Sequence, residues 1–74
     1  MPKKIRELKS LLLKAGFTVE RGKGSHTKWS HPLLSGKLTL SGKDGSDAKS
    51  YQEKDVYEAI LKVENTQDHK EPER

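Results

Sequence analysis

The chain has 74 residues, enough for a single domain, with 30% apolar residues and a formal net charge of +4 at neutral pH. It contains no cysteine, which excludes a disulfide framework and a thiolate metal site and favours a reducing, intracellular compartment. No apolar run approaches the length of a membrane-spanning helix, and the N-terminus lacks a signal-peptide pattern. We therefore expect a cytoplasmic protein that does not bind to a membrane.

The charge is distributed unevenly along the chain. Residues 64–74 hold four acids, two bases and no apolar residue, so we expect them to form a disordered tail that buries nothing. The remaining residues 1–63 would form the folded domain, and their thirteen bases and seven acids give it a net charge of +6. A small basic domain favours a phosphate-rich partner, although a charge excess that only keeps the protein in solution has the same composition.

The first predicted element is a helix over residues 3–15. Its apolar residues recur at spacings that place them on one stripe, and Gly16 follows as a C-cap. The opposite face is basic, which suits either a phosphate backbone or plain solvation, and Leu13 lies off the stripe among those bases. The buried stripe is expected to contain Ile5, Leu8, Leu11, Leu12 and Ala15.

Three short strands are predicted next. Residues 17–21 and 37–40 alternate apolar and polar side chains, as strands with one buried face do. Residues 25–31 contain no glycine or proline and lie between glycines and a proline, so they form a third candidate strand. The turn at residues 22–24 would pair this strand with residues 17–21, and the three strands would form an antiparallel meander.

The strand predicted over residues 25–31 has two different faces. Because side chains alternate across a strand, Thr27, Trp29 and His31 would share one face. We expect Trp29 to point into the core beside Leu38 and Leu40. The other face would be exposed and cationic, and would hold His26, Lys28 and Ser30.

The last predicted element is a second helix. It follows a polar loop over residues 41–49, and Ser50 and Glu53 have the spacing of a capping box, so the helix should begin near Tyr51. Beside its buried stripe, Tyr57 and Leu61 form an i,i+4 pair that we assign to the core, a binding surface being the alternative. The buried stripe is expected to contain Val56, Ala59, Ile60 and Val63.

The predicted fold class is α+β: a helix, a three-stranded antiparallel sheet and a second helix. Both helices would cover one face of the sheet, leaving the other face open to solvent or to a partner.

The sequence also resembles a known family. A helix followed by Gly16 and Phe17, then Arg21, then residues 24–26 with the sequence Gly-Ser-His at the start of a strand, then Pro32, is similar to the small HicA-type toxins of bacterial toxin–antitoxin pairs. This resemblance implies a fold like that of double-stranded RNA-binding domains. It also implies cleavage of messenger RNA until a HicB-type antitoxin binds. In the family's pattern, His26 corresponds to the catalytic histidine, and Gly24 and Ser25 to the turn beside it.

The residues themselves are compatible with an RNA-cutting site. If the 2′-hydroxyl attacks the adjacent phosphorus, a site must move protons and hold extra negative charge. The imidazole of His26 could move protons near neutral pH. The substrate phosphate could be held by the cations Arg21, Lys23 and Lys28, and by backbone N–H groups of the turn at Gly24 and Ser25.

Other candidate groups in the sequence have less support. Alternation places His31 opposite His26, so we interpret His31 as a structural residue at a strand end unless a bulge intervenes. The acids are too dispersed for a two-metal nuclease, and we expect neither a metal nor another cofactor.

Three hypotheses remain open from the sequence. The first is a HicA-type endoribonuclease with His26 as the acid–base residue. The second is a non-catalytic module that binds double-stranded RNA by shape and charge. The third is a protein-interaction domain whose basic face meets an acidic partner.

Overall fold

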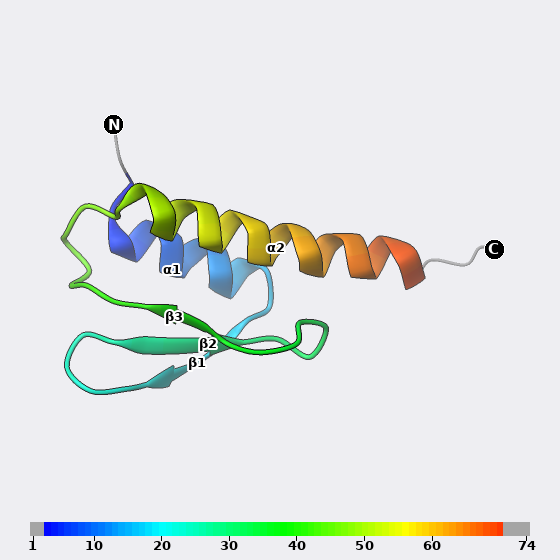
Figure 1. The fold of residues 1–74 in the computed structure, drawn as a ribbon, viewed down its shortest axis with the longest axis horizontal. Coiled ribbons are helices and arrows are strands. Elements are labelled where there is room, and N and C mark those ends of the chain that lie inside the picture. Colours follow the sequence, from blue (N-terminus) through cyan, green and yellow to red (C-terminus); the bar gives the residue numbers. More distant parts are fainter. Residues whose placement is uncertain (1–2, 71–74) are drawn as a thin grey trace.

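The computed structural model describes residues 3–70 and contains two helices and three strands. The elements are α1 (Ile5–Lys14), β1 (Thr18–Arg21), β2 (Thr27–Ser30), β3 (Leu38–Leu40) and α2 (Ser50–Lys70). The three strands form one antiparallel sheet in the order β1-β2-β3. Both helices lie side by side over the same face of this sheet, and α2 extends well beyond it (Figure 1). The predicted α+β arrangement, which is consistent with a double-stranded RNA-binding-domain-like fold, is confirmed.

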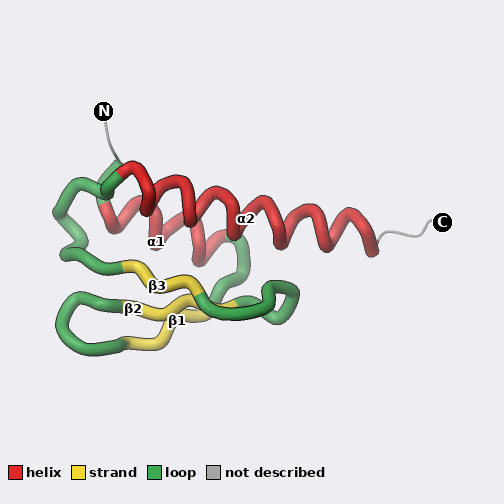
Figure 2. The backbone as a smooth tube through the Cα atoms, viewed as in Figure 1, coloured by secondary structure: helices red, strands yellow, loops and turns green. Residues whose placement is uncertain are grey.

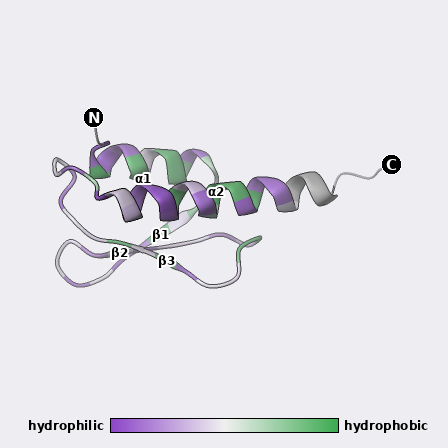
Figure 3. Cartoon of the chain, turned by 45° about the horizontal axis from the view of Figure 1, so that its top comes forward, coloured by the Kyte–Doolittle hydropathy of each residue, from purple (hydrophilic) through white to green (hydrophobic). Residues whose placement is uncertain are grey.

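The core lies between the helices and the sheet. Helix α1 contributes Ile5, Leu8 and Leu12, and Leu11 and the C-cap residue Ala15 are partly buried, as the helical spacing predicts. Figure 3 shows hydrophobic and hydrophilic residues interspersed along α1 and along the coloured part of α2. From the rest of the chain, the core includes Phe17, Trp29, Leu40, Ala48, Val56, Ala59 and Val63.

The central strand β2 fixes the register of the sheet. Trp29 lies opposite Val19 on β1 and opposite Leu38 on β3. Trp29 is buried and Lys28 is exposed, so the predicted faces of this strand are confirmed. β2 begins at Thr27 rather than at residue 25, because a turn in which the N–H of His26 donates to the carbonyl oxygen of Lys23 lies directly before it. Figure 2 shows this connection between β1 and β2 as a loop.

Two predictions of buried apolar residues are wrong. Val19 is 45% exposed, because β1 is an edge strand and α2 packs on β3 at the opposite edge. Tyr57 and Leu61 are 42% and 55% exposed, because the stripe through Val56 and Ala59 already fills the contact of α2 with the core. Leu13 is exposed, as predicted.

The start of α2 also differs in detail from the predicted capping box. The N–H of Lys49 donates to the side-chain oxygen of Gln52 at 2.9 Å, so Gln52 and not Glu53 satisfies the backbone before the helix. The Glu53 carboxylate instead accepts from the N–H of Lys3 at 3.1 Å. The amide of Gln52 also donates to the Ser41 carbonyl oxygen at 2.8 Å, which attaches the helix to the end of β3.

Helix α2 is longer than the sequence suggests. It continues to Lys70, past residue 63, where the predicted domain ends, and the expectation that residues 64–74 form a disordered tail stays a prediction. The last four residues of that predicted tail lie outside the described residues.

Candidate functional site

A cleft of about 310 Å³ lies where three parts of the chain meet. These parts are helix α1, the β1–β2 connection and the β3–α2 loop, and Figure 1 shows the connection and the loop at the same end of the molecule. The cleft is lined by Lys9, Arg21, Gly24, Ser25, His26, Thr27, Gly42, Lys43 and Asp44.

The β1–β2 connection, residues 22–26, is held by its own backbone. The N–H of Gly22 donates to the carbonyl oxygen of His26 at 2.9 Å, and the N–H of His26 donates to the carbonyl oxygen of Lys23 at 3.0 Å. Gly24 has a φ of 60° and Ser25 does not have a positive φ, which is the pattern of a type II′ turn with glycine at its first central position. These bonds fix the backbone of His26, and its side chain remains exposed at the cleft.

Hydrogen bonds of Thr27 attach this connection to the core. The indole N–H of Trp29 donates to Thr27 Oγ1 at 2.9 Å, and that hydroxyl donates to the Leu40 carbonyl oxygen at 3.0 Å. Thr27 is 8% exposed and Trp29 is 1% exposed, so both polar groups are satisfied inside the protein. The residue that follows His26 is therefore attached to the centre of the core.

The β3–α2 loop forms hydrogen bonds with the two other parts of the chain that line the cleft. The N–H of Gly42 donates to Ser25 Oγ at 3.3 Å, which joins the loop to the turn before His26. Farther along, the carbonyl oxygens of Asp44 and Ser46 accept from the N–H groups of Arg6 and Ile5 at 3.1 and 2.9 Å. These N–H groups belong to the first turn of α1 and have no partner within the helix. The loop thus connects α1 to the turn that carries His26.

The cleft has a cationic lining with one acid. Lys9, Arg21 and Lys43 come from three different parts of the chain, and a cleft with several cations attracts anions. The acid is Asp44, whose Oδ1 lies 2.7 Å from the ammonium nitrogen of Lys9. The hydrogen bond and charge of Lys9, together with the charges of Arg6 and Arg21, lower the pKa of Asp44 below its ordinary value.

The structure brings together four of the predicted site residues, and they are Arg21, Gly24, Ser25 and His26. The other two predicted contacts do not line the cleft. Lys23 is exposed in the turn, and Lys28 is exposed on the sheet face away from the helices, with Glu20 and Thr39 opposite it on the neighbouring strands.

Sequence reasoning did not single out two of the cleft cations as site residues. The basic face of the first helix pointed to Lys9 only as one of several bases, and Lys43 lies in a polar loop. Their convergence on His26 depends on contacts between segments far apart in the sequence, which the residue pattern does not show.

The side chain of His31 contacts neighbouring residues of the fold and does not line the cleft. Its Nδ1 accepts a hydrogen bond from the N–H of Leu33 at 3.0 Å, and its ring lies 5.1 Å from the ring of Phe17 between centroids. These contacts agree with the interpretation of His31 as a residue that holds the end of β2.

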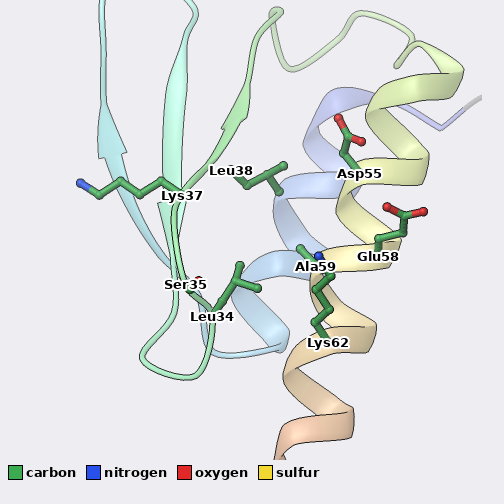
Figure 4. A pocket seen from close by; sticks show the side chains of 8 residues that line it. All are labelled: Leu34, Ser35, Lys37, Leu38, Asp55, Glu58, Ala59 and Lys62. Atoms are coloured by element: carbon green, nitrogen blue, oxygen red, sulfur yellow. The ribbon is translucent and has the colours of Figure 1, made fainter.

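A second hollow of about 200 Å³ lies between α2 and the segment around β3. Leu34, Leu38 and Ala59 give it an apolar floor, and Asp55 and Glu58 lie along its α2 side (Figure 4). It is lined by no histidine, so it offers no imidazole for proton transfer near neutral pH.

The described part of the chain shows neither a cluster of metal ligands nor a membrane-spanning helix. Among the side chains that the structure describes, in residues 3–66, no three histidine or acidic side chains gather closely enough to hold a metal ion. Neither described helix has the length and apolar character needed to cross a membrane.

A model of a known protein family matches the part of the chain that contains the cleft. The family model described as the HicA toxin of bacterial toxin–antitoxin systems matches residues 5–62, which include every residue that lines the cleft. No curated protein and no solved structure gives a significant match. Since the family model covers most of the chain, this protein belongs to the HicA toxin family of bacterial toxin–antitoxin systems.

Proposed function

We propose that this toxin is an endoribonuclease that cuts messenger RNA, with His26 as the residue that transfers a proton. The observation that carries the proposal is the position of the His26 side chain: it is exposed at a cleft that also gathers Lys9, Arg21 and Lys43. An imidazole beside several cations combines the proton carrier and the anion-binding groups that phosphodiester cleavage needs. Membership of a family whose members generally cleave messenger RNA supports the same function.

The proposed reaction is attack by the RNA's own 2′-hydroxyl. The 2′-oxygen forms a bond to the adjacent phosphorus and loses its proton, while the bond from phosphorus to the 5′-oxygen breaks and that oxygen gains a proton. The products are a 2′,3′-cyclic phosphate and a 5′-hydroxyl. His26 serves one of the two proton transfers and water serves the other, and no metal ion takes part.

The cations of the cleft have a different role in this proposal. Lys9, Arg21 and Lys43 bind the phosphate groups and stabilise the extra negative charge that develops as the 2′-oxygen attacks. Gly24 and Ser25 keep the turn close to the substrate, and Ser25 does so through its bond with Gly42.

The proposed biological partner is a HicB-like antitoxin in the cytoplasm. A protein that covers the cleft would exclude RNA and so neutralise the toxin. The test begins with the neighbouring genes: one of them should encode a small antitoxin-like protein, which is then purified and added to the cleavage reaction, and the absence of such a gene would count against this partner. One equivalent should suppress cleavage, and unchanged cleavage by a stable complex would show that the antitoxin binds elsewhere.

The catalytic proposal is tested with purified protein and a labelled messenger RNA. His26→Ala and His26→Gln should reduce the cleavage rate by about 10²–10⁴, the usual contribution of a general acid or base. His69→Ala is the control, because residue 69 lies in the last turn of α2, at the opposite end of the molecule from the β1–β2 connection (Figure 1). Circular dichroism establishes that each variant is folded.

The outcomes separate the candidate functions. Equal rates for the wild type and both His26 variants would eliminate this histidine as the proton carrier. A chelator should leave the wild-type rate unchanged, and loss of activity would show that a metal ion takes part. RNA binding without cleavage by the wild type would favour the non-catalytic RNA-binding module.

A further inference from the structure

Asp44 is the only carboxylate among the residues that line the cleft, and the charged side chains around it are cations. Its Oδ1 lies 2.7 Å from the ammonium nitrogen of Lys9, while Arg21 and Lys43 line the same cleft. A carboxylate oxygen and a phosphate oxygen are interchangeable ligands for an ammonium group, since both are anionic acceptors of its hydrogen bonds. In the free protein, a side chain of the protein itself therefore fills the position where Lys9 would bind a phosphate.

This ion pair is built so that it can open without disturbing the fold. Asp44 is held in place by its backbone, whose carbonyl oxygen accepts from the N–H of Arg6 at 3.1 Å. Its side chain is 65% exposed and that of Lys9 is 25% exposed. Exposed ion pairs of this kind stabilise a protein only weakly. A polyanion that contacts several cations at once competes well against a single carboxylate for Lys9.

We propose that the cleft contains a phosphate subsite formed by Lys9 and Lys43, that Asp44 occupies this subsite in the free toxin, and that an RNA phosphate displaces it. This inference rests on the proposed function in that RNA supplies the phosphate. Asp44 acts as an internal competitor: binding of the phosphate separates the Asp44 carboxylate from Lys9, and Asp44 thereby lowers the affinity of the toxin for RNA.

The same loop provides a matched control. Asp47 also forms an exposed ion pair with a lysine near the start of α1, Lys4, at a distance of 2.6 Å. Its side chain is 58% exposed, and it does not line the cleft. Asp44→Asn and Asp47→Asn therefore make the same change in net charge and each break one Lys–Asp pair. Only the first removes an anion from the proposed subsite.

The experiment measures binding of a short, fluorescently labelled RNA that carries 2′-O-methyl groups, which the toxin cannot cut by 2′-oxygen attack. Asp44→Asn should bind this RNA about two- to fivefold more tightly than the wild type, as expected for removal of one weak competing ion pair. Its slope of log affinity against log salt should match that of the wild type, because the Lys9–phosphate contact forms in both complexes. Asp47→Asn should leave the affinity close to that of the wild type.

Lys9→Ala provides a second, independent test. If Asp44 competes for Lys9, Asp44→Asn should increase RNA affinity less in the Lys9→Ala protein than in the wild type. The difference between the two increases measures the coupling between the residues. Asp44→Ser, which also lacks the charge, should reproduce the gain of Asp44→Asn. Circular dichroism and thermal melting confirm that all variants are folded.

The results distinguish this inference from the proposed nuclease activity. Equal binding by Asp44→Asn and Asp47→Asn, weaker binding by Asp44→Asn, or no RNA binding by any variant would overturn the subsite. Cleavage of unmodified RNA is measured separately on the wild type. Tighter binding by Asp44→Asn together with an inactive wild type would support the subsite and reject the nuclease. Unchanged binding by Asp44→Asn together with RNA cleavage by the wild type would reject the subsite and support the nuclease.

Discussion

Trp29 connects the stability of the domain to the geometry of the cleft. Its ring is 1% exposed in the centre of β2, with Val19 and Leu38 opposite it on the neighbouring strands. Its indole N–H donates to Thr27 Oγ1 at 2.9 Å, and Thr27 is the residue that follows His26. Replacing Trp29 with alanine therefore removes the largest side chain of the core and a hydrogen bond beneath the cleft.

The expected cost of Trp29→Ala is large for a domain of this size. Removing a fully buried tryptophan destabilises a protein by about 3–5 kcal/mol, because apolar contacts are lost and a cavity remains. A chain of 74 residues has a total stability of about 4–11 kcal/mol at typical values per residue. The variant should thus lose about a quarter or more of its free energy of unfolding. Thr27→Val, which leaves the buried indole N–H without a partner, should cost about 1–3 kcal/mol.

Urea denaturation followed by far-ultraviolet circular dichroism measures both effects. Fluorescence is unsuitable because Trp29 is the only tryptophan of the chain. We expect a clearly lower midpoint for Trp29→Ala and a smaller decrease for Thr27→Val, with similar slopes in all three proteins. A wild-type midpoint for Trp29→Ala would refute the placement of this residue in the core and, with it, the assignment of faces on β2.

Three further predictions concern the frame and the charge of the cleft. Gly16→Ala should lower the free energy of unfolding by about 1–2 kcal/mol, because Gly16 has a φ of 93° and a new Cβ would lie 3.2 Å from Nε2 of His31; urea denaturation measures the loss. Lys43→Ala should reduce the log–log salt slope of RNA binding by about 0.7–0.9 and Lys28→Ala by less, and equal effects would show that RNA also contacts the open sheet face. Because its lysine partner lowers the pKa of Asp44 below 3.8, the stabilisation by this pair is present at neutral pH and is lost as the pH falls through the lowered value. The difference in thermal midpoint between the wild type and Asp44→Asn should shrink in acid, and a constant difference would contradict the pairing.

Most of the fold was predictable because short-range patterns determine it. The helical spacing of Ile5, Leu8 and Leu12 and the alternation around Trp29 each identify a buried face without knowledge of the partner element. The errors concern how far that burial extends. Val19 alternates correctly but lies on β1, whereas α2 packs on β3 at the other edge of the sheet, and no local pattern shows which edge the helix will cover.

The candidate site was only partly predictable for a related reason. His26, Arg21 and the glycine-rich turn are close in sequence, so one local motif identifies them. Lys9 and Lys43 reach the cleft only because the β3–α2 loop bonds to the first turn of α1 and to the turn before His26. The length of the β1–β2 connection was also missed, since the bond from Gly22 to the carbonyl oxygen of His26 leaves no trace in the residue pattern.

The most direct test of the account is an analysis of RNA ends together with binding for the wild type and His26→Ala. The account predicts that the wild type produces 2′,3′-cyclic phosphate and 5′-hydroxyl ends. His26→Ala should yield almost none, yet it should bind 2′-O-methylated RNA with unchanged affinity, because the cations of the cleft remain. Wild-type ends of the opposite kind, 3′-hydroxyl and 5′-phosphate, or equal cleavage by the folded His26→Ala protein would contradict it.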